Sequence, residues 1–168
     1  MDNLKIAFLS SSRFEDNSIR GAILVTDTDT KPVEFRITDP VRPTPFQRTL
    51  YGEILDEHIL VELIGVPLLR ELQEKPTFVL VQNEVFLGVN TKQEIPVIQL
   101  LNETDRQGKN VVTEQLPSSK FTPIRIATLK SLESRLTNIN TKLTQMYEYR
   151  DLLEPFKRLE VACQQVNN

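Results

Sequence analysis

A repeat of apolar residues near the C-terminus constrains most strongly how this chain folds. These residues alternate spacings of three and four: Leu129, Leu132, Leu136, Ile139, Leu143 and Met146. The pattern is the a/d seam of a packed helix. Ser, Thr, Asn and Gln fill most positions between them, and such residues have poor helix propensity. The helix therefore draws its stability from packing, either on a partner chain or on the chain's own sheet.

Earlier segments show the patterns of buried strands and turns. The run GAILVT at 21–26 is almost continuously apolar, and 32–38 alternates apolar and polar residues. Because the turn residues DTDTK at 27–31 separate these two runs, we expect an antiparallel hairpin. Further strands are predicted at 4–9, 77–81, 95–101 and 122–128, whereas the polar segments 10–17 and 102–120 are predicted to be loops.

Prolines and glycines divide the middle of the chain into helices. Thr44 followed by Pro45 is typical of a helix start, and Gly52 is placed to end that helix. The following apolar block reaches residue 74 and is predicted to lie centrally in the core. The fold class is therefore α/β or α+β: a mixed sheet of about five to six strands, an early antiparallel hairpin, a central buried helical block and a C-terminal amphipathic extension. We expect a mixed-sheet domain over 1–128 and a helical docking segment over 129–168.

Composition narrows the function classes. Lysines and arginines number 20 against 23 acidic residues, so no global basic field attracts nucleic acid or an anionic membrane. The single cysteine excludes an intramolecular disulfide, and no apolar stretch approaches the ~18 residues of a membrane span. None of the five glycines forms a phosphate-binding loop, so no cofactor is expected. Cytoplasmic residence without membrane contact follows as the default expectation.

The reactive side chains lack the partners that catalysis requires. His58 is the only histidine, and no nucleophile or orienting acid stands at a suitable spacing from it. Cys163 lies in an apolar stretch more than one turn from Lys157 and Arg158, which favours a packing thiol over a nucleophile. We therefore expect no catalytic residue and no metal site at these positions.

A proline-rich segment between the hairpin and the first helix carries a group of candidate binding residues: Arg36, Arg42, Arg48 and Tyr51. Arginine and tyrosine are enriched in protein interfaces, and arginine beside an aromatic ring also binds phosphates and bases. The chain's acidity favours the protein interface over nucleic acid. The remaining alternative is a rigid linker whose arginines are solvated or paired with acidic residues.

The acidic residues around the hairpin raise a second functional alternative. Asp27, Asp29, Glu34 and Asp39 gather there, and carboxylates on adjacent strands bind Mg²⁺ for phosphodiester cleavage. The element order also resembles the opening of a ribonuclease-H-like fold, whose first strand carries a central acid and whose later strand ends in another. Here the strand at 77–81 is followed by Gln82 and Asn83. The other interpretation is ordinary turn acids.

The leading functional hypothesis is a non-catalytic accessory or adaptor subunit of a larger complex. It would dock through its C-terminal helices onto another protein, or onto a second copy of itself. The alternative is a ribonuclease-H-like metal-dependent nuclease, or a nucleic-acid-binding relic of one. Nucleic acid is the less favoured partner.

Overall fold

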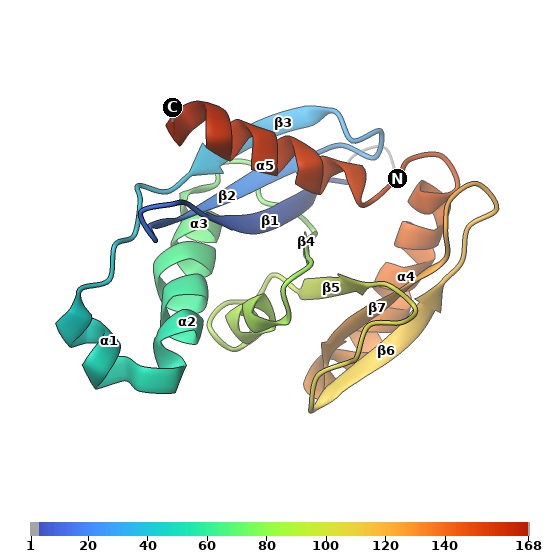
Figure 1. Cartoon of the computed structure of the whole chain (residues 1–168). Coiled ribbons are helices and arrows are strands. Elements are labelled where there is room, and N and C mark those ends of the chain that lie inside the picture. Colours follow the sequence, from blue (N-terminus) through green and yellow to red (C-terminus); the bar gives the residue numbers. More distant parts are fainter. Residues whose placement is uncertain (1–3, 168) are drawn as a thin grey trace.

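The computed structural model describes residues 4–167. Its centre is a seven-stranded sheet in the order β3-β2-β1-β4-β5-β7-β6 (Figure 1). The strands are β1 (Ile6–Arg13), β2 (Ile19–Thr26), β3 (Pro32–Ile37), β4 (Phe78–Val81), β5 (Val97–Leu101), β6 (Val111–Leu116) and β7 (Ile124–Leu129). β1, β4 and β5 run parallel, and the pairs on either side of them are antiparallel. The expected mixed α/β sheet with its early hairpin is confirmed.

Helices connect the strands and cover both faces of the sheet. They are α1 (Pro45–Tyr51), η1 (Gly52–Ile54), α2 (Leu55–Glu57), η2 (His58–Gly65), α3 (Val66–Glu71), η3 (Glu84–Thr91), η4 (Lys130–Leu132), α4 (Glu133–Tyr147) and α5 (Glu154–Asn167). η2 is a π-helix, whereas η1, η3 and η4 are 3₁₀ helices. No helix within 4–167 is both long and apolar enough to cross a membrane.

Two hydrophobic layers enclose the sheet. On one face, Ile6, Phe8 and Leu80 belong to a core cluster that also contains side chains of α4 and α5. On the other face, Ala7 and Val79 pack in a cluster with η2, α3 and η3. The alternation of these residues along the strands sends them to opposite faces. Coverage on both sides explains why the segments 6–9, 78–81 and 97–101 of the parallel strands are apolar apart from Gln99.

Two segments predicted to be loops are strands or parts of strands. β1 continues through Ser10–Ser12 to Arg13, because its antiparallel ladder with β2 extends from Ile6↔Thr26 to Arg13↔Ile19. β6 lies inside the polar segment 102–120 and pairs along its length with β7 at the edge of the sheet. The sheet therefore has one strand more than the upper limit predicted from the sequence.

The C-terminal seam packs on the chain's own sheet. Leu136, Ile139, Leu143 and Met146 of α4 are buried in the same core cluster as the strands, while Leu129 and Leu132 before the helix are half-buried. The sequence pattern allowed packing on a partner chain or on the chain's own sheet, and the structure shows packing on the sheet. Partner binding by these six residues stays a prediction, and so does the division of the chain at residue 128. The helices beyond residue 128 contribute side chains to the core of the sheet.

Helix α1 begins and ends as its sequence predicts. The Thr44 hydroxyl accepts a hydrogen bond from the Gln47 backbone N–H at 3.1 Å, and the Gln47 side chain accepts one from the Thr44 N–H at 2.8 Å. This reciprocal capping box, with Pro45 in the first turn, fixes the start of the helix. Gly52 ends it with a φ of 56°. None of the residues of α1 is buried, and Figure 1 shows the helix projecting from the body of the molecule.

Candidate nucleic-acid groove

A polar groove opens where β1 and β4 end beside α5. We call it the β1–α5 groove, and its volume is about 540 Å³. Its lining residues are Ser10, Ser11, Ser12, Arg13, Gln82, Leu153, Phe156, Lys157, Glu160 and Gln164. Extending the register Phe8↔Leu80 by two residues sets Ser10 beside Gln82 on adjacent parallel strands. Hydroxyl and amide groups therefore line the floor, and α5 forms one wall.

A second hollow of about 520 Å³ continues from this groove. It shares Arg13 and Gln164 with the first and adds Phe14, Glu15, Asp16 and Asn167. A hydrogen bond from the Ser18 hydroxyl, joined by the Ser18 backbone N–H and by Arg42, holds the pKa of Asp16 below its ordinary value. The two hollows therefore contain both positive and negative side chains. Arg13 lines both hollows, and Lys157 lines the first.

The groove lacks the carboxylates that a metal-dependent nuclease needs. Glu160 is the only carboxylate that lines the first hollow. The first strand has Ser10 and Ser12 on the α5 side, and Gln82 follows β4. Within residues 4–167, no group of three or more His, Cys, Asp or Glu side chains is arranged to hold a metal ion. Two metal ions of a phosphodiesterase need several such ligands.

The acids predicted around the hairpin have structural contacts instead. One Asp27 carboxylate oxygen accepts the backbone N–H groups of Asp29 and Lys31, each at 2.9 Å, and thereby closes the turn. Glu34 accepts the N–H groups of Gln73 and Glu74 beyond the end of α3. Asp27 therefore acts as a turn acid, whereas Glu34 lies within β3 and holds the segment that follows α3.

The carboxyl group of Glu34 has a perturbed pKa. Desolvation by burial acts to raise it, but hydrogen bonds from the Glu74 and Gln73 N–H groups and from Arg36 lower it by more. The net effect is a pKa below the ordinary value, because these partners stabilise the charged form.

The predicted arginine group is only partly brought together. Arg36 pairs with Glu34 at 2.8 Å on β3, and Arg42 pairs with Asp16 at 3.3 Å. Arg42 and Tyr51 line one small pocket of about 140 Å³, which Arg36 and Arg48 do not line. Arg48 lies in the last turn of the exposed helix α1. A binding role for these four residues stays a prediction.

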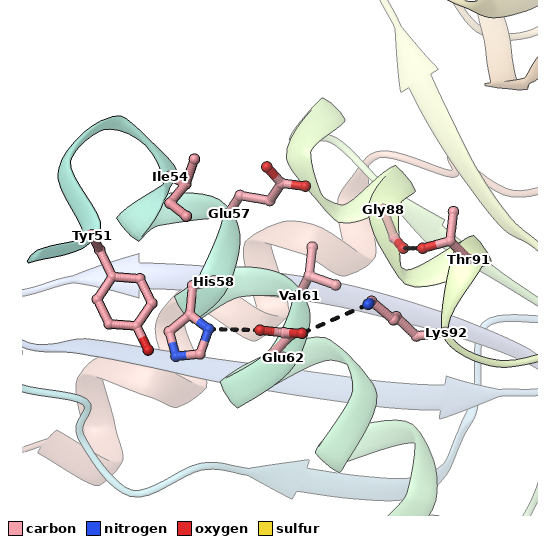
Figure 2. Close-up of a pocket in the computed structure, with 9 residues that line it drawn as sticks. All are labelled: Tyr51, Ile54, Glu57, His58, Val61, Glu62, Gly88, Thr91 and Lys92. Carbon is pink, nitrogen blue, oxygen red and sulfur yellow. Dashed lines mark hydrogen bonds and ion pairs between the residues drawn. The ribbon is translucent and has the colours of Figure 1, made fainter.

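A second pocket lies between α2–η2 and η3, and we call it the His58 pocket (Figure 2). The Tyr51 ring stacks on His58 with centroids 4.5 Å apart. His58 Nδ1 is 2.6 Å from a Glu62 carboxylate oxygen, and Lys92 Nζ is 3.7 Å from the other oxygen. The hydrogen bond with His58 is the main cause that lowers the pKa of Glu62. His58 is half-buried, and its contact with Glu62, four residues further along the chain, shows that the expectation of no acid at a suitable spacing was wrong.

Comparison with known proteins identifies the fold. No family model matches the chain, and no curated protein matches it. Human ENDOV superimposes with a TM-score of 0.57 and 14% identity, covering 96% of this chain and 83% of that one. The chain is also similar to Ciona intestinalis Endonuclease V bound to inosine-containing DNA, with a TM-score of 0.49, 10% identity and coverage of 79% and 75%.

A third similar structure is Marinitoga piezophila Argonaute with guide RNA. Its TM-score is 0.40 at 8% identity, with coverage of 75% of this chain and 22% of that one. At 14% identity, the likeness to human ENDOV shows the fold alone. At the ends of β1 and β4 that line the groove, this chain carries Ser10 and Gln82.

Proposed function

We propose that this chain binds a single nucleic-acid strand in the β1–α5 groove and does not hydrolyse it. The observation that carries the proposal is the chemistry of the groove: hydroxyls and amides at the ends of β1 and β4, in a fold shared with human ENDOV. Hydroxyl and amide groups bond to sugars, phosphates and base edges. They do not replace the carboxylate ligands of catalytic metal ions.

The charges around the groove set the expected strength of binding. Arg13 and Lys157 supply positive charge, Glu160 opposes it, and the whole chain has a formal charge of −3. The electrostatic contribution to binding is therefore small, and so is the number of released counterions. Recognition rests on hydrogen bonds inside the groove and on contacts with Phe14, which lines the adjoining hollow and packs partly against the core.

The test measures binding and cleavage separately. Fluorescence anisotropy with labelled single-stranded DNA and RNA, at low and moderate salt, measures affinity and its salt dependence. Lys157→Glu should weaken binding about tenfold, because it reverses a charge at the groove wall. Lys130→Glu is the matched control, since Lys130 is exposed and lines neither hollow.

Each outcome bears on one part of the proposal. Intact oligonucleotides after incubation with Mg²⁺ or Mn²⁺ would support the non-hydrolytic role, whereas cleavage would restore the nuclease hypothesis. Failure to bind either strand at low salt would overturn the nucleic-acid role. An equal loss of affinity in Lys157→Glu and Lys130→Glu would show that the nucleic acid does not bind in the groove.

The accessory-subunit role is the second candidate function. A specific observation favours it: Phe46, Leu50 and Ile54 project large apolar side chains into solvent from α1 and η1. Exposed large apolar side chains are frequent at interaction sites. This surface lies on the helical connection between β3 and β4, so a protein partner there would leave the β1–α5 groove free.

A further inference from the structure

Glu160 is the one acidic side chain among those that line the β1–α5 groove. Arg158, two residues earlier on α5, pairs with Glu154, and Arg13, which lines the same groove, pairs with Asp56. Within residues 4–167, the Glu160 carboxylate forms no ion pair and no side-chain hydrogen bond. Its two oxygens are therefore free to accept hydrogen bonds from a molecule that binds in the groove.

The side chains that α5 and the turn before it present to the groove lie along one side of it. They recur at spacings of three and four residues, as expected for one face of a helix: Leu153, Phe156, Lys157, Glu160 and Gln164. Leu153 is half-buried and Phe156 is buried, so this wall has an apolar part, whereas Glu160 and Gln164 are exposed and polar. A nucleobase has the same division, with apolar faces and an edge of hydrogen-bonding groups.

The carboxylate of Glu160 restricts which base edge can bind beside it. A carboxylate accepts hydrogen bonds through both oxygens and donates none. Guanine presents two adjacent donors, N1–H and the N2 amino group, on its Watson–Crick edge. Adenine and cytosine place a ring acceptor beside their amino group, and thymine places its single N–H between two carbonyls. Guanine is therefore the base that satisfies both oxygens.

We propose that the β1–α5 groove selects guanine in a single strand and that Glu160 determines this specificity. The proposal rests on the nucleic-acid role proposed above and adds the identity of the base. Lys157 lies one turn before Glu160, and within residues 4–167 the two form no ion pair, so Lys157 is free to meet a phosphate. The groove volume of about 540 Å³ lies within the range of small-molecule pockets and accommodates a nucleotide.

Two other partners match the Glu160 carboxylate less well. A ribose hydroxyl donates one hydrogen bond, which leaves the second oxygen without a partner. A divalent cation needs several ligands, and no group of three or more His, Cys, Asp or Glu side chains among residues 4–167 is arranged to hold one. The guanine edge is therefore the best match.

The experiment compares short DNA oligothymidylates that differ in one central base. The probes carry guanine, adenine, cytosine or hypoxanthine there, and fluorescence anisotropy with the full chain measures each affinity. The guanine probe should bind about tenfold more tightly than the adenine and cytosine probes, because only guanine supplies two adjacent donors. Hypoxanthine lacks the N2 amino group, so its probe should bind with intermediate affinity. Equal affinity for guanine and adenine, or for guanine and hypoxanthine, would overturn the proposal.

Substitution of Glu160 tests the assigned residue. Glu160→Gln replaces one acceptor with a donor, so the guanine preference should disappear and the adenine probe should bind most tightly. Glu133→Gln is the matched control and should retain the guanine preference, since Glu133 is exposed on α4 and lines neither hollow. A guanine preference that persists in Glu160→Gln would refute the assignment. Equally tighter binding of all four probes by Glu160→Gln would also refute it, because Glu160 would then act only by repelling phosphates.

Further measurements separate this proposal from the nucleic-acid role on which it rests. Failure of the wild type to bind any probe at low salt would overturn both. Lys157→Glu should weaken the guanine and adenine probes by the same factor, because Lys157 meets a phosphate. If Lys157→Glu weakens binding but the wild type does not distinguish the bases, only the selection of guanine is overturned. A loss of affinity in Glu160→Gln for RNA probes of every base, without a loss for DNA, would assign Glu160 to the ribose hydroxyl and overturn the proposal.

Discussion

Ser10 of β1 and the Gln82 that follows β4 line the same groove, two residues beyond the paired Phe8 and Leu80 of these parallel strands. Adjacent strands are about 4.8 Å apart, so two carboxylates at these positions would share a cation. Glu160 lines the same groove from α5. Neither a serine hydroxyl nor a glutamine amide supplies the negative charge of a carboxylate ligand, so Glu160 stands alone as a carboxylate in the lining of this groove.

The first prediction tests this relationship by introducing the two carboxylates. Ser10→Asp combined with Gln82→Asp should create a divalent-cation site together with Glu160. Millimolar Mn²⁺ should then raise the melting temperature of the double variant by about 5 °C, because a ligand that binds only the folded state stabilises it. Differential scanning fluorimetry with and without Mn²⁺ measures the shift.

The control for that experiment is the double variant Ser10→Asn and Gln82→Asn. It has nearly the same side-chain volume and no charge, so Mn²⁺ should leave its melting temperature, and that of the wild type, unchanged. An equal Mn²⁺ response in the amide variant would show that the cation binds elsewhere.

The second prediction concerns the packing of α4 on the sheet. Leu143 is 0% exposed, so Leu143→Ala should lower the free energy of unfolding by about 2–5 kcal/mol. Thr141→Ala on the exposed side of the same helix should change it by no more than about 0.5 kcal/mol. Urea denaturation of the chain alone measures both values. Equal stabilities would mean that α4 does not need the sheet.

The third prediction concerns the close contact between Gly21 and Ile64. A Cβ atom on Gly21 would lie 2.0 Å from the Ile64 Cγ2 atom, so η2 approaches β2 more closely than any larger residue allows. Gly21→Ala should cost about 1–3 kcal/mol through overpacking. Adding Ile64→Ala removes the obstructing methyl group, so the double variant should be more stable than the sum of the single effects predicts. Strict additivity would contradict the contact.

The fourth prediction gives a pH dependence to Glu34. Because its folded-state pKa is lowered, its contribution to stability is fully present above the unfolded-state pKa and is lost as pH falls through the folded-state value. Glu34→Gln should therefore reduce stability by about 1 kcal/mol at neutral pH, with allowance for solvent screening. The difference from wild type should vanish in strong acid. A difference that is the same at pH 7 and in strong acid would show that charge plays no part.

The fifth prediction concerns the reactivity of Cys163. Burial raises the pKa of its thiol, an effect that exceeds the opposing influence of the Ser12 hydrogen bond and of Arg20. The thiol is therefore protonated at neutral pH and is 2% exposed, so a disulfide reagent should react with it only slowly. Unfolding in urea should bring the rate to that of a free thiol. Rapid reaction of the native chain would show that α5 opens readily.

The central strands could be predicted from the sequence because their environment dictates their composition. GAILVT and the last four residues of TFVLV are buried, and burial on both faces favours apolar residues. The helix start at Thr44–Pro45 follows from local hydrogen bonding, which needs no tertiary information. β6 escaped prediction because an edge strand is half-exposed, so its sequence VVTEQL has the polarity of a loop.

The groove could not be predicted from the sequence for a related reason. Ser10–Ser12 looks like a loop and is held in β1 only by its ladder with β2. Gln82 and Glu160 come to the same place from β4 and α5, and no spacing along the chain links them. The acidic residues considered in the sequence lie around the hairpin, whereas the groove forms at the ends of β1 and β4. Only the order of the strands in the sheet shows which of these positions lie close together.

The hydroxyl and amide groups at the floor of the groove also avoid electrostatic repulsion in the folded state. Carboxylates crowded at the ends of parallel strands repel one another until an ion neutralises them, which is one source of the trade-off between activity and stability. With Ser10, Ser12 and Gln82 in these places, the folded state carries no such repulsion. The stability of the folded chain should therefore not depend on divalent ions. Chelators or magnesium starvation should leave the protein folded.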